Sequence, residues 1–184
     1  MLIDPERYER ALHFAATAHR GQVIPGSDNP YVLHPATVAA ELIAIAASEP
    51  FDVDLAVTCA LLHDTVEDTP VTQDELAERF GDAVARGVAA LSKSDALPKD
   101  QRMADSLRRI LLETREVAMV KLADRIVNLA EPPHYWSRDK RLAYQAEARV
   151  ILAQLGAASP ALATRLAARI ERYGGFIPAA PAPE

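Results

Sequence analysis

The chain contains little of what secreted or membrane proteins rely on. Its one cysteine, Cys59, allows no intrachain disulfide, and its place in an apolar run marks it as a small buried side chain. No apolar run approaches the roughly 18 residues that a membrane-spanning helix needs. The N-terminus also lacks the basic and then apolar layout of a secretory signal. These absences predict a soluble cytoplasmic protein with no membrane partner.

Positive charge is also in short supply. Lys and Arg total 20 against 26 Asp and Glu, which gives a formal net charge of -6. DNA or RNA binding needs a broad basic surface, so we expect no nucleic-acid partner. An acidic protein can still bind a small anionic substrate if a metal ion and a few local cations oppose the overall field.

The pattern of caps and stops predicts helices throughout. Apolar residues recur at helical spacing, and Ser, Thr, Asp, Pro and Gly punctuate the runs. We expect a single all-α bundle over residues 1–176 and a disordered Pro/Ala tail over 177–184. The expected helices cover residues 5–21, 35–47, 52–66, 72–81, 82–92, 99–114, 117–129, 137–155 and 159–173.

Local signals fix several helix ends. Asp4 followed by Pro5 predicts the start of the first helix, and Thr72 with Glu75 matches a capping box. The apolar stripe of the first helix is predicted to be Tyr8, Leu12, Ala15 and Ala18.

The most informative run is ALLHDTVEDT at residues 60–69. On a continuous helix, residues four apart share a face, so His63 should lie beneath Glu67 and Asp64 beneath Asp68. His63 and Asp64 are therefore candidate metal ligands. Glu67 and Asp68 are candidates to orient or deprotonate a water molecule, the alternative being a solvated helix end.

Two further candidate ligands lie elsewhere in the chain. His34 closes the run PYVLH, and Asp124 lies in KLADRIVN at residues 121–128. Together with His63 and Asp64 they form a mixed nitrogen and oxygen donor set. Such a set suits Mn²⁺ or Fe²⁺ above Zn²⁺, although ligand type alone does not decide. The pattern predicts a His-Asp metal-dependent phosphohydrolase.

Polar residues flank Asp124 at helical spacing. Asn128 lies four residues on and is predicted to hydrogen-bond the substrate. Lys121 and Arg125 are candidates for phosphate contacts, and the open alternative for both is a salt-bridged structural role.

These motifs resemble the hydrolase domain of the RelA/SpoT family. The resemblance rests on AHRGQ at 18–22, YVLHP at 31–35, the run at 60–69, and KLADR at 121–125 with Asn128. It extends to TQDEL at 72–76 and to the Trp136-Ser137 helix start, and it spans roughly residues 5 to 175. In size the chain is similar to stand-alone small alarmone hydrolases.

The resemblance implies a fold and an activity. The fold would be an HD-domain helical bundle, and the activity Mn²⁺-dependent release of pyrophosphate from the 3′ position of (p)ppGpp. Carried over by motif, His34, His63, Asp64 and Asp124 would hold the metal. Glu67 and Asp68 would manage the attacking water, and Asn128 would contact the nucleoside.

One departure from the family affects the substrate. After Gly-Gln the family usually has basic residues, whereas this chain has Val23-Ile24-Pro25. A cation able to stack on a base or neutralise phosphate is therefore missing from these positions. The alternative substrates are an adenine alarmone such as ppApp, and NADPH. An alternative function is a nucleotide sensor without turnover. The helical surface would also allow a homodimer, which nothing in the sequence specifies.

Overall fold

The computed structural model describes residues 3–179 of the chain. That part is helical, and its one β-type contact is an isolated antiparallel bridge between Val23 and Pro30. The prediction of an all-α bundle is confirmed. The helices are α1 (Pro5–Ala18), α2 (Leu33–Ile45), α3 (Val53–Leu62), α4 (Thr65–Asp68), α5 (Gln73–Phe80), α6 (Asp82–Leu91), α7 (Lys99–Ile110), α8 (Arg115–Asn128), α9 (Arg138–Leu155) and α10 (Pro160–Gly174), with a 3-10 turn at Gly156–Ala158.

The predicted caps form. The Asp4 carboxylate accepts hydrogen bonds from the backbone N–H groups of Glu6 and Arg7, which start α1. Thr72 accepts from the Glu75 N–H at 3.2 Å and starts α5. Each bond satisfies a donor that a helix N-terminus otherwise leaves without a partner, so these starts are legible in the sequence.

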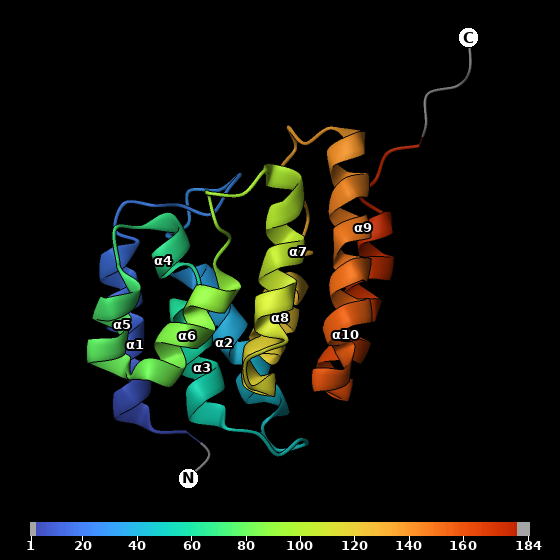
Figure 1. Ribbon diagram of the computed structural model, residues 1–184. Helices are drawn as coiled ribbons and strands as arrows, with labels where there is room; N and C mark the ends of the chain where they lie inside the picture. Colours follow the sequence, from blue (N-terminus) through green and yellow to red (C-terminus); the bar gives the residue numbers. More distant parts are fainter. Residues whose placement is uncertain (1–2, 180–184) are drawn as a thin grey trace.

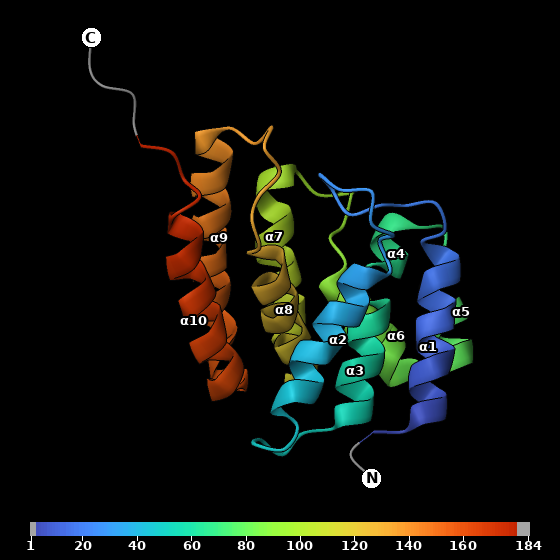
Figure 2. The same ribbon diagram turned by 180° about the vertical axis from the view of Figure 1, so that it is seen from behind.

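Two helices form the centre of the molecule. Residues 56–62 of α3 are buried on every side, because α3 packs among α1, α2, α6 and α8. α8 is buried over residues 116–126, between α2 and α3 on one side and the α9–α10 pair on the other. Figures 1 and 2 show α9 and α10 at one end of the bundle and α1 and α5 at the other. A helix that is buried all round gives its few polar side chains an interior environment.

The predicted stripe of α1 was partly wrong. The side chains that α1 buries most deeply are Ala11 and Ala15, followed by His19 just beyond its end, whereas Tyr8 and Leu12 pack only at the edge of the core. Small residues face α3 because α1 and α3 pack closely against each other. Of the predicted residues, Ala15 is deeply buried, whereas Leu12 and Ala18 give way to their neighbours Ala11 and His19.

The predicted helix over 52–66 is two helices, with His63 and Asp64 in the break between them. His63 Nδ1 donates to the Ala60 carbonyl at 2.7 Å, and the Thr65 hydroxyl donates to the Leu62 carbonyl at 2.7 Å. Side-chain donors that take backbone carbonyls compete with helix continuation. The break turns the His-Asp pair toward α2 and α8.

Other boundaries differ by a few residues. α2 begins at Leu33 rather than Pro35, so His34 lies inside the helix, and Pro35 sits in its first turn, where a proline is tolerated. α7 ends at Ile110 rather than Thr114. Ile177, where the predicted tail begins, packs against the core, and residues 180–184 of that tail lie outside the described residues.

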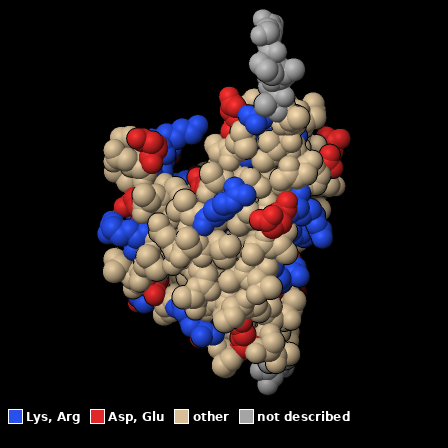
Figure 3. Space-filling view, turned by 90° about the vertical axis from the view of Figure 1, so that its right-hand side faces the viewer, with Lys and Arg blue, Asp and Glu red and all other residues tan. Residues whose placement is uncertain are grey.

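On the face formed by α9 and α10, Lys and Arg side chains are scattered among Asp and Glu over a largely uncharged surface and form no continuous basic patch (Figure 3). Among residues 3–179, no helix combines the length and apolar character that crossing a membrane requires.

Candidate metal centre

Three elements meet to form a cluster of metal-ligand side chains. His34 comes from α2, His63 from the end of α3, and Asp124 from α8, and one ligand atom of each lies within 4.8 Å of the others. Asp124 Oδ1 is 3.4 Å from His34 Nε2 and 3.7 Å from His63 Nε2. All three residues are at most 7% exposed. Sequence positions far apart thus supply one buried donor set.

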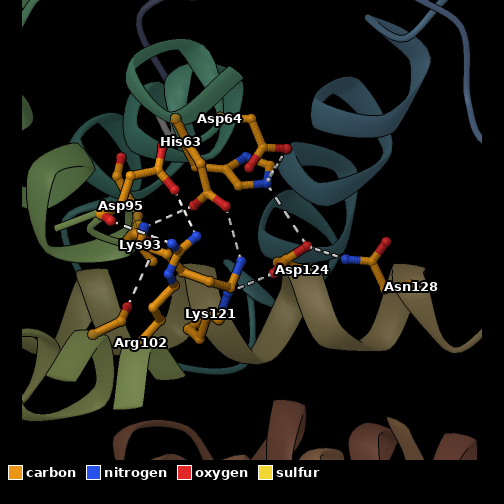
Figure 4. A network of polar contacts seen from close by, with 12 residues as sticks. His63, Asp64, Lys93, Asp95, Arg102, Lys121, Asp124 and Asn128 are labelled. Carbon is orange, nitrogen blue, oxygen red and sulfur yellow. Dashed lines mark hydrogen bonds and ion pairs between the residues drawn. The ribbon is translucent and has the colours of Figure 1, made fainter. Parts of the chain in front are cut away.

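The fourth predicted ligand lies beside this cluster. Asp64 Oδ2 is 3.0 Å from His63 Nε2 and 3.6 Å from His34 Nε2. The same oxygen accepts a hydrogen bond from the Tyr31 hydroxyl at 2.6 Å. Figure 4 shows Asp64 and His63 on one side of the site and Asp124 on the other. Asp64 therefore lies next to the cluster of His34, His63 and Asp124 without being one of its three members.

The orientation of His63 fits a metal ligand. Its Nδ1 faces the Ala60 carbonyl at 2.7 Å, which requires a proton on Nδ1 and aims Nε2 at the carboxylates. Nε2 is buried and has no hydrogen bond to any described residue. A backbone carbonyl that fixes the imidazole tautomer in this way is the usual support of a histidine ligand. The donor set therefore fits a divalent ion.

The electrostatics favour a cation at this point. Burial opposes charge on His63, yet the carboxylates of Asp64 and Asp124 raise the pKa of its imidazole well above the ordinary value. Burial likewise opposes charge on Asp124, but Lys121 and the two histidines hold the pKa of its carboxyl well below the usual range. The site keeps both carboxylates ionised and draws positive charge between them.

Glu67 and Asp68, the predicted water-handling acids, have different surroundings. Both oxygens of Glu67 are occupied by Lys93, one by its backbone N–H at 2.8 Å and one by its Nζ at 3.0 Å. Asp68 is exposed as a residue, but partial desolvation of its carboxyl, together with the nearby charges of Asp64 and Glu67, raises its pKa. A raised pKa makes a carboxylate a better proton acceptor, which suits Asp68 to take a proton from water.

No spacing rule in the sequence joins Lys93 to Glu67, 26 residues away. The loop that carries it is held by Arg102, which donates to the Asp95 carboxylate and to the Leu97 carbonyl. Burial opposes charge on Lys93, but Glu67 raises the pKa of its ammonium group. Lys93 therefore adds a fixed positive charge to the site (Figure 4).

The predicted substrate contacts on α8 point in different directions. Lys121 and Asn128 both donate to the Asp124 carboxylate, Lys121 at 3.0 Å. Arg125 is 3% exposed and faces α9, where it pairs with Glu147 and lies 4.3 Å from the centroid of the Tyr144 ring. For Arg125 the geometry favours the structural alternative.

A cavity of about 430 Å³ adjoins the site. His34 and Asn128 form its boundary with the ligand cluster. Gly26, at φ 84°, lets the loop approach Pro133, because a Cβ there would lie 3.2 Å from a Pro133 carbon. The cavity is lined by Ile24, Pro25, Leu33, His34, Thr37, Val127, Asn128, Ala130, Glu131, Pro132, Pro133, Trp136 and Tyr144.

Known proteins are similar to this chain in sequence and in fold. A guanosine-3′,5′-bis(diphosphate) 3′-pyrophosphohydrolase MESH1 from Danio rerio is 37% identical over 134 residues, covering 70% of this chain and 73% of that protein. A guanosine-3′,5′-bis(diphosphate) 3′-pyrophosphohydrolase from Aquifex aeolicus is 35% identical over 127 residues, or 67% of this chain. The chain spans only 17% of that relative's length.

Solved structures agree. One, titled "A metazoan ortholog of SpoT hydrolyzes ppGpp and plays a role in starvation responses", superposes with a TM-score of 0.79 at 26% identity, covering 92% of this chain and 96% of that one. The resemblance to RelA/SpoT-type hydrolases is thereby confirmed. The HD domain family matches residues 11–161. This chain belongs to the HD domain family.

Proposed function

We propose that this protein is a metal-dependent guanosine-3′,5′-bis(diphosphate) 3′-pyrophosphohydrolase, which converts (p)ppGpp to GDP or GTP and pyrophosphate. The observation that carries the proposal is the buried convergence of His34, His63 and Asp124 beside a nucleoside-sized cavity. The MESH1 and Aquifex relatives bear the name of this activity. A cytoplasmic location is part of the same proposal.

His34, His63, Asp64 and Asp124 are the proposed ligands, and Mn²⁺ is the proposed ion, with Fe²⁺ or Zn²⁺ as alternatives for the same donors. When bound, the ion supplies positive charge against the phosphate oxygens and acidity for water. The Ala60 carbonyl keeps His63 in the tautomer that ligation needs.

The other residues have separate tasks. In the reaction, water adds its oxygen to the phosphorus on the ribose 3′ oxygen, that P–O bond breaks, and the 3′ oxygen takes up a proton. Asp68, exposed and with a raised pKa, would accept the water's proton. Glu67 would orient the water while it anchors Lys93, and Lys93 would face the pyrophosphate charge.

The nucleoside would occupy the adjoining cavity. Trp136 and Tyr144 offer aromatic surface there, and Asn128 lies where the cavity meets the metal cluster. We propose Asn128 as a nucleoside contact and keep Lys121 as the partner of Asp124, which places it near the phosphates. Arg125 would act through α9 rather than on substrate.

One observation favours a second candidate, a related phosphohydrolase of another nucleotide such as ppApp or NADPH. The described residues that line the cavity include no Lys or Arg, and Ile24 and Pro25 occupy the loop where a cation would stack on a base. If the substrate is a guanine nucleotide, no cation of the lining can select it. Selectivity for guanine would have to come from Glu131, the one carboxylate among the described lining residues, and from backbone groups.

Product analysis separates the candidates. Mn²⁺-loaded protein would be incubated with ppGpp, ppApp, NADPH and GTP in parallel. Release of GDP and pyrophosphate from ppGpp alone is the expected result. Turnover of another member instead would move the function to that nucleotide. If metal is bound but none of the four nucleotides is turned over, a sensor without turnover would be favoured.

A further inference from the structure

The loop between α1 and α2 lies against the break that holds His63 and Asp64. It is tied to itself by backbone hydrogen bonds, from Ile24 N–H to the Asn29 carbonyl at 2.9 Å and from Tyr31 N–H to the Gln22 carbonyl at 3.0 Å. Its side chains then reach across to residues 64 and 68. A loop ordered by its own backbone can hold a neighbour at a fixed distance.

Tyr31 makes the first of these contacts. Its hydroxyl donates to Asp64 Oδ2 at 2.6 Å. Because Oδ2 is also 3.0 Å from His63 Nε2, the bond fixes the carboxylate against the imidazole. The same Oδ2 is 3.6 Å from His34 Nε2. Tyr31 therefore holds the Asp64 oxygen that lies beside both histidines.

Gln22 makes the second contact. Its Nε2 donates to the Asp68 carbonyl at 2.9 Å, and because a carbonyl only accepts, the amide orientation is settled. Its Oε1 then accepts from His19 Nδ1 at 2.7 Å. The His19 ring is 3% exposed and lies 4.8 Å from the Tyr31 ring. The chain from His19 through Gln22 holds the end of α4, where Asp68 lies.

We infer that this loop is the positioning element of the metal centre, with Tyr31 holding Asp64 so that its carboxylate completes the ligand set, and Gln22 holding α4 so that Asp68 stays beside it. Tyr31 and Gln22 are positioning residues, because they act through Asp64 and Asp68. The inference rests on the proposed function only in that the site binds a divalent ion. It assigns the AHRGQ and PYVLH segments a task that the ligand set leaves unexplained.

The test measures metal binding alone, without any nucleotide. Chelator-stripped wild-type and Tyr31→Phe proteins would be titrated with Mn²⁺. Hydrogen bonds to ligating groups typically contribute 10–100-fold in metal affinity, so Tyr31→Phe should bind Mn²⁺ about 10-fold or more weakly. Thermal stability of the metal-free variant should stay close to wild type, since the aromatic ring remains in place.

Tyr173→Phe is the matched control. Its hydroxyl is also buried but has no hydrogen bond to a described residue, so its removal should leave Mn²⁺ affinity unchanged. A second readout uses Co²⁺, whose visible absorption reports ligand number and geometry. The Co²⁺ spectrum should change in Tyr31→Phe and not in Tyr173→Phe. A role confined to packing would leave that spectrum unmoved.

The outcomes are distinguishable. Wild-type affinity and spectrum in Tyr31→Phe would overturn this inference while the metal site stood. A wild-type protein that binds neither Mn²⁺ nor Co²⁺ would overturn the metal part of the proposed function and the inference with it. Loss of affinity in both Tyr31→Phe and Tyr173→Phe would also contradict the inference, because hydroxyl removal in general would then be the cause.

Discussion

The two faces of α8 bury opposite kinds of surface. Toward α2 and α3 the helix presents Lys121 and Asp124, charges that sit among two histidines and a further carboxylate. Toward α10 the neighbouring side chains are apolar, among them Leu162, Leu166 and Ile170, each at most 2% exposed. The first side carries the candidate metal site, and the second contributes apolar packing to the stability of the fold.

The magnitudes explain the difference. Full burial of one Leu or Ile side chain stabilises a fold by roughly 1.5–3 kcal/mol. Buried ion pairs contribute little net stability, because desolvation offsets the attraction. The side of α8 that carries Lys121 and Asp124 is therefore kept for what it binds, and apolar packing against α10 supplies stability that this side lacks. A change on one side of α8 should therefore leave the property carried by the other side intact.

The largest effect is expected from Asp64→Ala. The variant loses a proposed ligand carboxylate, so bound metal and turnover should fall together, turnover by at least ~10³-fold if the ion supplies several kcal/mol. Metal content by elemental analysis and pyrophosphate release check both. Normal metal content would refute the ligand role of Asp64.

Leu166→Ala should do the reverse. It truncates a fully buried side chain on α10, which costs about 3 kcal/mol of unfolding free energy, or about 6–12 °C in Tm. Mn²⁺ affinity of the folded protein should stay within about twofold of wild type, because α10 does not reach the ligands. Leu142→Ala on α9, 36% exposed, is the control and should change little. A fall in metal affinity would show that the two faces are coupled.

Glu67→Gln should separate metal binding from chemistry. Its oxygens contact Lys93 rather than the ligand cluster, so metal should stay bound while turnover slows by about 10²-fold. Glu78→Gln, on the exposed side of α5, should leave both quantities unchanged. Unchanged turnover in Glu67→Gln would make Glu67 a structural anchor of Lys93.

The smallest effect concerns Glu116 at the start of α8. Burial opposes its charge, but the hydrogen bond from the Asp52 N–H, together with those from its own N–H and from Thr114 and the charge of Arg115, lowers the pKa of its carboxyl below the ordinary 4.5. Its ionised form therefore stabilises the fold above about pH 4.5, and that contribution is lost as pH falls through the folded-state pKa. Glu116→Gln should remove about 1 kcal/mol or less at pH 7. Urea unfolding of both proteins at pH 7 and pH 4 checks this, and a gap that widens toward pH 4 would contradict it.

Sequence reasoning did well where the signal is local. The caps at Asp4 and Thr72 are read from neighbouring residues, and both form, as do serine caps at Ser137 and Ser159, where two further predicted helices begin. The sequence motifs also named His34, His63 and Asp124 as candidate ligands, and the structure brings these three side chains together, while their role as ligands stays a prediction. The break after Leu62 was missed, since it depends on the side chains of His63 and Thr65 taking backbone carbonyls.

Contacts between distant segments could not be predicted from the sequence. Nothing in the sequence joins Lys93 to Glu67, Tyr31 to Asp64, or Gln22 to the Asp68 carbonyl. Arg125 shows the converse, because spacing puts it near Asp124 while its side chain turns to Glu147 on α9. Residues one position apart on a helix face different neighbours, and only the packing decides which.

The most direct test of the central claim is metal add-back. Chelator-stripped protein would be titrated with Mn²⁺ while pyrophosphate release from ppGpp is followed. The account predicts no turnover in the stripped protein and full recovery as about one ion binds per chain, with GDP as the nucleotide product. Turnover that persists without metal, or that never returns although the ion is bound, would contradict it.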